Sequence, residues 1–284
     1  MLTKVEITNP RNTILTCLLG GSGPNTEAIQ VRNIEGLGPV KADVGTSPFG
    51  SIDGEAYTGS SVGKRNLVIT VGLNPNWIDQ SIESLRTLLY AYFMPKQSVK
   101  LRFFSDSMVT VEISGYVEGF EPNIFTKDPE IQISIICPMP DFVAIASTVV
   151  TGIVAPNNVP QPGADIGYAG NVAAGFLLRV DANATVPAYS GPLDIVSRTP
   201  FSLAFSINPM TADNGQYFEM SSVRGTKYAQ GVNILGGARV TLLRNVAASS
   251  AWPQLEPGVN NFYVAASTSG QAWTLTYFNR FGGL

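Results

Sequence analysis

The sequence predicts a mainly β protein with one major helix, divided into two domains. Short segments in which apolar and polar residues alternate with a period of two recur along the chain, as in strands that bury one face. A single segment has the three-to-four-residue spacing of an amphipathic helix. The 284 residues are long for a single core and fit two domains of ordinary size. The 28 glycines and 19 prolines supply the turns that many short strands require.

The first domain is expected over residues 1–147, as a sheet covered by the helix. Its strands are expected at 2–8, 13–19, 28–34, 40–44, 67–73, 98–104, 108–118 and 130–137. The later strands alternate most clearly, so each of them should bury one face. The proline-rich stretch 138–140 is expected to end this domain.

The helix is expected to follow Asn74-Pro75-Asn76, because an Asn cap and a proline in the first turn are typical start signals. Pro95 should end it. Asp79 and Glu83 lie early, where a carboxylate interacts favourably with a helix N-terminus. Apolar side chains form one stripe, at positions 78, 82, 85, 88, 89, 92 and 93. A helix with such a stripe must pack on a sheet.

Residues 45–63 are rich in glycine and poor in large apolar side chains. Two interpretations are open: a mobile loop, or a long β-arm that becomes ordered only against a neighbouring molecule. We favour the arm, because residues 55–57 could pair with residues 67–71 across it.

The second domain is expected over residues 148–284, after a linker and a first strand within 143–171. Short strands are predicted at 172–182, 192–197, 201–207, 216–221, 231–235, 239–243, 259–266 and 272–279. Turn signals recur between these segments and no helix is evident, which indicates a two-sheet antiparallel sandwich. Trp252 and Tyr263 could face a glycan or a protein partner. The alternative, which we favour for most aromatic residues of this domain, is that they turn into the core.

The sequence lacks the residues of common catalytic and metal sites. It has no histidine, which excludes Ser-His-Asp and Cys-His catalytic arrangements and His-ligated metals. Cys17 and Cys137 lie in apolar, strand-like runs, so we expect two buried thiols rather than a disulfide. No catalytic, cofactor-binding or metal-binding residue is predicted, and the chain is not expected to be an enzyme.

Charge is low and unevenly placed. The net charge is −3, which excludes the basic footprint of a nucleic-acid reader. Residues 1–147 hold 11 basic and 15 acidic side chains, whereas residues 148–284 hold 7 and 6. No segment approaches 18 consecutive apolar residues, and the first ten residues lack the apolar run of a signal peptide. Membrane insertion is therefore not expected.

Several short motifs, in order along nearly the whole chain, resemble those of bacteriophage distal tail proteins. In the first domain they are GKRNLVI at 63–69, SLRTLLY at 84–90, GYVE at 115–118 and ICPMPDF at 136–142. In the second they are FEMS at 218–221, GTK at 225–227, WPQLEPGVN at 252–260 and YFNRFGG at 277–283. Each motif alone is weak, and the resemblance rests on their order and spacing.

This resemblance implies a tail-tube-like first domain that forms a homohexameric ring, and a galectin-like β-sandwich as the second domain. It implies a structural virion protein that is assembled in the bacterial cytoplasm and joins the tail tube to the hub or baseplate. The second domain would anchor receptor-binding or other tail-tip proteins. Gly50, Tyr57 and Arg65 are the candidate ring contacts on the arm. An acidic first domain would let DNA pass through the lumen as cargo without binding to it.

Two other functions remain open. One is a tail-tube subunit with an added decorative domain, which differs from a distal ring in its number of copies per virion. The other is a carbohydrate-binding module, which would bind host glycans through an exposed aromatic side chain.

Overall fold

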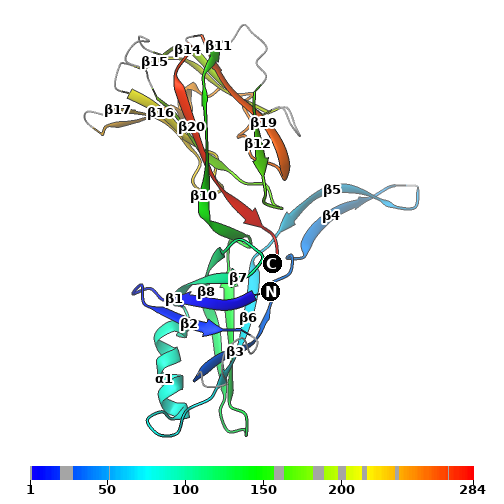
Figure 1. Cartoon of the computed structure of the whole chain (residues 1–284). Helices are drawn as coiled ribbons and strands as arrows, with labels where there is room; N and C mark the ends of the chain where they lie inside the picture. Colours follow the sequence, from blue (N-terminus) through cyan, green and yellow to red (C-terminus); the bar gives the residue numbers. More distant parts are fainter. Residues whose placement is uncertain are drawn as a thin grey trace. The chain divides into compact units, whose positions relative to one another are not determined.

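The computed structural model describes residues 2–19, 28–50, 52–156, 163–181, 189–197, 203–212, 216–233, 237–267 and 269–284. The chain forms two compact units: Met1–Ile145 together with Phe281–Leu284, and Ala146–Arg280. The expected mainly β fold with one major helix is confirmed, because both units consist mainly of strands and one α-helix occurs among the described residues (Figure 1). The described part of the second unit also contains a 3-10 turn, Leu243–Asn245.

The first unit contains a seven-strand core, a separate hairpin and the helix. The core strands are β1 (Leu2–Thr8), β2 (Ile14–Leu18), β3 (Ile29–Glu35), β6 (Arg65–Leu73), β7 (Ser98–Ser105), β8 (Val111–Asn123) and β9 (Glu130–Cys137). The hairpin is β4 (Ala42–Pro48) with β5 (Glu55–Val62), and the helix is α1 (Ile82–Phe93). The expected strands match these positions closely, apart from the hairpin.

The long strand β8 links two groups of strands. Its first half pairs with β7 and its second half pairs with β9, all antiparallel. The order is β2-β1-β7-β8-β9-β6-β3, and a bridge between Leu19 and Val31 joins the two ends of this series. A register shift between Val117 and Gly119 lies within the pairing with β9, just past Tyr116, the last residue of β8 that pairs with β7. Such a shift bends a strand, which lets β8 serve both groups.

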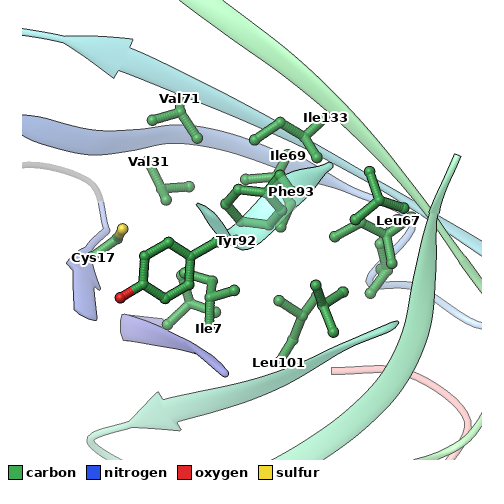
Figure 2. Packing of buried hydrophobic residues seen from close by; sticks show 14 of the residues in the cluster. Ile7, Cys17, Val31, Leu67, Ile69, Val71, Tyr92, Phe93, Leu101 and Ile133 are labelled. Atoms are coloured by element: carbon green, nitrogen blue, oxygen red, sulfur yellow. The ribbon is translucent and has the colours of Figure 1, made fainter. Parts of the chain in front are cut away.

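The strands and the helix enclose one apolar core, part of which is shown in Figure 2. Strand residues with a period of two meet the buried face of α1, which contributes Leu85, Leu89, Tyr92 and Phe93. Cys17 and Cys137 are buried in the same core and form no disulfide, as expected. The helix therefore covers the sheet, as expected, although Leu88 of the predicted stripe lies at its edge and is 44% exposed.

The predicted helix start was wrong by about two turns. Asn76 accepts hydrogen bonds from the backbone N–H groups of Ile78 and Asp79, which closes a local turn instead of a helix. Trp77 has a φ of 60°, outside the helical region. The helix begins at Ile82, after Ser81, so Ile78 does not join the stripe and is 93% exposed.

Ser81 caps the helix through a reciprocal pair with Ser84. The Ser81 hydroxyl accepts from the Ser84 N–H (3.2 Å), and the Ser84 hydroxyl accepts from the Ser81 N–H (3.0 Å). This is a capping box with serine in place of the usual Glu or Gln, so the sequence signature is easy to miss. Hydrogen bonds from its own backbone N–H and from Ser81 lower the pKa of Glu83 in the first turn.

Asn9 fixes the turn between β1 and β2 to the last turn of the helix. Its side-chain amide donates to the carbonyl of Ala91 (3.0 Å), and its oxygen accepts from the N–H groups of Arg11 and Thr13 (3.0 Å each). The Ala91 carbonyl lies in the last helical turn, where carbonyls lack helical partners. Asn9 is buried, so water does not replace it easily.

Replacing Asn9 with alanine is expected to lower the free energy of unfolding by about 1–3 kcal/mol, since three backbone groups lose their partner. Urea unfolding of the full chain measures this loss. Asn33→Ala is the matched control, because Asn33 is exposed and bonds only at 3.4 Å to Glu35. Equal stability of the two variants would contradict the role assigned to Asn9.

The second unit is a two-sheet sandwich. One sheet has the order β18 (Arg239–Thr241), β17 (Tyr228–Asn233), β16 (Gln216–Ser221), β13 (Phe176–Asp181) and β20 (Ala272–Phe281). In the other, β19 (Gly258–Ala266) pairs with β14 (Tyr189–Ser197), which pairs with β15 (Leu203–Ala212). β12 (Ala164–Tyr168) and β11 (Ala155–Pro156) also pair with β19. A separate apolar core fills this unit.

The stretch expected as a linker and a first strand is more regular than predicted. Phe142–Ile153 forms one continuous strand, β10, whose first residues Val143 and Ala144 pair with β8. Its many β-branched residues favour a strand, although apolar and polar residues do not alternate regularly along it. Residues 157–162, with two of those prolines, lie outside the described part of the chain.

Among the described residues, no helix has the length and apolar character needed to cross a membrane.

Candidate assembly surface

The most exposed regular structure in the first unit is the hairpin of β4 and β5, which we call the arm. The two strands pair with each other from Ala42 with Val62 to Pro48 with Glu55, and they form a sheet of their own. All residues of β4 and most of β5 are exposed. Figure 1 shows the arm extending away from the other strands of its unit. An isolated two-stranded hairpin is marginally stable in water, so an additional contact would stabilise it.

The expected pairing of residues 55–57 with 67–71 was wrong. Residues 55–57 pair with 46–48 inside the arm. Residues 67–71 lie in β6, which already has β3 on one side and β9 on the other. A strand that is paired on both sides has no free backbone groups for a third strand.

Large apolar side chains lie on the surface of the arm. Ile52 and Tyr57 are 74% and 65% exposed, and Val44, Phe49 and Val62 are also exposed. At the tip, Phe49 lies against Gly54, whose φ of 114° suits glycine. The Tyr57 hydroxyl donates to Ser60 (2.8 Å), which holds its ring along the strand. Exposed apolar groups on an otherwise unsupported hairpin are typical of a surface that binds another protein.

The arm is also acidic. Residues 42–62 include Asp43, Asp53 and Glu55 and no lysine or arginine. Two cations flank the arm in the sequence, Lys41 before it and Lys64 after it. A partner surface for the arm is therefore expected to be apolar with positive charge around it.

The three residues predicted on the arm have different positions. Gly50 is exposed at the tip, with no atom near the place where a side chain would begin. Tyr57 is exposed on β5. Arg65 is only 1% exposed and lies in the base of the arm, by which we mean residues 36–42 and 62–65. There its side chain donates hydrogen bonds to backbone carbonyls of the same chain. The structure thus places Gly50 and Tyr57 at separate points of the arm surface and leaves Arg65 buried below the arm.

The two aromatic residues predicted to face a partner do not form one platform. Trp252 is partly buried and its ring packs on Phe205, with 4.7 Å between ring centroids. The Lys227 ammonium also lies over the Trp252 ring, with its Nζ atom 5.8 Å from the ring centroid. Tyr263 is partly exposed and lines an open cavity of about 200 Å³ with Trp273 and other residues. Trp273 itself is buried in the sandwich core.

The described residues contain no cluster of three or more His, Cys, Asp or Glu side chains that could hold a metal ion. Cys137 is an ionisable side chain in the core of the first unit. Burial raises the pKa of the Cys137 thiol to about 11, and the nearby Arg65 charge opposes this shift without cancelling it. The thiol is therefore protonated at neutral pH and is a poor nucleophile.

The raised pKa of Cys137 gives a pH dependence of stability. The protonated thiol contributes its full stability below the ordinary thiol pKa of about 9 and loses it as pH rises through about 11. We expect the free energy of unfolding to fall between these pH values, and this fall to shrink in Cys137→Ala. A thiol reagent at neutral pH should react only after denaturation. Rapid reaction of the native protein would contradict the buried, protonated state.

No protein-family model matches the chain. No curated protein matches it by sequence either. Solved structures do match. The crystal structure of the Dit protein (gp 19.1) of phage SPP1, described as a paradigm of the hub adsorption apparatus in phages that infect Gram-positive bacteria, has a TM-score of 0.64. The match covers 98% of this chain and 99% of that one, at 14% identity.

Two structures of the phage p2 baseplate in its activated conformation, with calcium and with strontium, are more distant. Each has a TM-score of 0.43, and the identities are 10% and 11%. Each match covers 97% of this chain and 98% of that one. At these scores they add nothing to the argument from SPP1 Dit. The predicted resemblance to phage distal tail proteins is confirmed at the level of the fold, which this chain shares with SPP1 Dit from end to end.

Proposed function

We propose that this chain is a structural protein of a phage tail tip, and that copies of it form a ring at the distal end of the tail tube. The observation that carries the proposal is the match of both units, in order, to the SPP1 Dit structure. The ring is expected to be hexameric, with the first unit as the ring-forming part. No catalytic role is assigned to the chain, and its place is in the virion after assembly in the bacterial cytoplasm.

The arm is proposed to make the contact between neighbouring copies. Its apolar side chains are exposed, and among the described residues its two strands pair only with each other, which leaves both outer edges uncovered. Packing the arm of one copy on the next would cover both. A contact between two different surfaces repeats around a ring when the rotation between copies closes. Gly50 and Tyr57 remain the proposed contact residues on the arm.

The remaining partners follow from a ring at this position. The tail tube would meet one side of the ring and the hub or baseplate the other. The second unit would hold receptor-binding or other tail-tip proteins. The first unit carries four more acidic than basic side chains, since Phe281–Leu284 add no charge. This balance supports a lumen through which DNA passes without binding.

The test is assembly of the purified full chain, followed by light scattering and electron microscopy of single particles. We expect closed rings whose formation depends on concentration. Replacing Ile52 and Tyr57 with serine should weaken association about tenfold or more, because anchor residues at interfaces typically contribute more than 1 kcal/mol each. A serine at Val240, an apolar residue of the second unit that is 62% exposed, is the matched control.

Two outcomes would contradict the proposal in different ways. A chain that stays monomeric under all assembly conditions, with or without tube and hub proteins, would exclude the ring. Rings that form equally well from the Ile52 and Tyr57 variant would keep the ring and exclude the arm as its contact. Labelled virions that carry many stacked rings would instead support a tail-tube subunit with a decorative domain.

The carbohydrate-binding alternative has one concrete location, the cavity beside Tyr263. It predicts saturable binding of host glycans by the full chain, with loss of binding in Tyr263→Ala. Trp252→Ala is the comparison variant, since the Trp252 ring already packs on Phe205. Absence of glycan binding by the wild-type chain would exclude this alternative.

A further inference from the structure

Arg65, the first residue of β6, carries a charge inside the first unit. Only 1% of the residue is exposed, although an isolated charge is costly to bury. Burial lowers the pKa of Arg65, and the nearby Cys137 and Asp141 raise it. An arginine stays protonated at any physiological pH, so the guanidinium remains a full charge in this position.

The guanidinium donates to four backbone carbonyls from three separate segments. Its Nε bonds to Pro140 (2.6 Å), its Nη1 to Gly38 (2.6 Å) and also to Gly36, and its Nη2 to Gly282 (2.5 Å). These five residues all belong to the first unit, so the network does not depend on the placement of the second. Charge-assisted bonds of this kind are stronger than bonds between neutral groups.

The three segments are those that lead to the arm and to the second unit. Gly36 and Gly38 precede β4, and Arg65 itself follows β5, so the network closes around the base of the arm. Pro140 precedes β10, along which the chain enters the second unit. Gly282 follows β20, along which the chain returns. We call these five residues the Arg65 clamp.

Three further contacts involve the segments that the Arg65 clamp joins. The guanidinium lies over the ring of Phe142, 4.5 Å from its centroid. The Leu284 N–H donates to the carbonyl of Leu37 (3.0 Å). Gly283 lies so close to Pro39 that an added Cβ would be 2.9 Å from the proline nitrogen. The segment 281–284 therefore packs directly on the base of the arm.

We propose that the Arg65 clamp couples the arm to both chain segments that connect with the second unit. The guanidinium is a rigid fork whose donors have fixed directions, so one carbonyl cannot move without misaligning bonds to the others. Docking of the arm on any partner biases the position of residues 36–38, and the clamp passes this bias to Pro140 and Gly282. The coupling is reciprocal, so a load on the second unit also biases the base of the arm.

The test is hydrogen exchange of the unassembled full chain, which is independent of ring formation. Arg65→Gln is expected to raise exchange about tenfold or more at three places together: the arm base at Ala42 and Val62, residues 143–145, and residues 282–284. Amides of β1 and α1 should change little. Arg32→Gln is the matched control, because Arg32 is a half-exposed arginine paired with Glu130.

A second variant keeps the test decisive if Arg65→Gln unfolds the unit. Gly283→Ala pushes the 281–284 segment against Pro39 and leaves Arg65 in place, and the coupling predicts that it raises exchange at residues 143–145, which the added Cβ does not touch. Gly167→Ala, where a Cβ meets nothing within 4 Å, is its control. Combining Gly283→Ala with Arg65→Lys should give less than the product of the two separate effects. A rise confined to the mutated segment, or spread equally over the unit, would overturn the coupling.

Discussion

Replacing Phe93 with alanine is expected to lower the free energy of unfolding of the first unit by about 3–5 kcal/mol. Phe93 is the last residue of α1, is 1% exposed and packs among strand residues from both groups in the core (Figure 2). Removing the ring leaves a cavity that the surrounding strands cannot fill, because their hydrogen bonds fix their spacing. The loss approaches the whole stability of many domains.

Urea unfolding followed by hydrogen exchange in each unit measures this effect. Exchange should increase throughout β1, β6 and α1 in Phe93→Ala, while amides in the core of the second unit keep their protection. Leu88→Ala is the control on the same helix, since Leu88 is 44% exposed, and it should change stability by less than about 0.5 kcal/mol. If both variants lose the same amount, the helix does not cover the core in the way described.

Replacing Trp273 with alanine should have a comparable effect on the second unit, about 3–5 kcal/mol. Trp273 lies in β20 and is 2% exposed. Its ring makes an edge contact with Phe262, and its Nε1 donates to the carbonyl of Ile153 (3.2 Å). Gly152 passes so close that an added Cβ would be 2.3 Å from the ring. The substitution thus removes a large apolar surface and leaves a backbone carbonyl without this donor.

Phe278→Ala is the matched control for Trp273, because Phe278 is an aromatic residue of the same strand that is 44% exposed. Its stability should stay within about 0.5 kcal/mol of the wild type. Calorimetry with exchange in β13 and β19 distinguishes the two. A stable Trp273→Ala variant would mean that the sandwich core depends on this residue less than its burial indicates.

Periodicity predicted the fold well where one face of an element is buried. The strands of the first unit and the last strands of the second were placed within a few residues, since alternation reports burial directly. The helix was predicted correctly as an element, and its start was not. The apolar stripe extends back to Ile78, but the Asn76 side chain accepts hydrogen bonds from the Ile78 and Asp79 N–H groups, which prevents a helix there. The spacing of apolar residues carries no information about such local hydrogen bonds.

The surface was harder to predict than the core. The arm could be identified from its composition, whereas its partner strand could not, because a pairing depends on which edges other strands have already occupied. Arg65 stands beside Lys64 in the sequence, and such a pair usually lies on the surface. Its burial depends on backbone carbonyls, which every residue offers, so no side-chain pattern marks its partners.

The insertion of the second unit into the sequence of the first determines when the first unit can finish folding. The second unit is inserted into the first, since Ala146–Arg280 lies between Ile145 and Phe281. On the ribosome, the first unit emerges early, yet Gly282 and Leu284 reach Arg65 and Leu37 only after the whole second unit has been translated. Domains generally fold as units as they emerge. Each new copy would thus complete the base of its arm last, when synthesis of both units is finished.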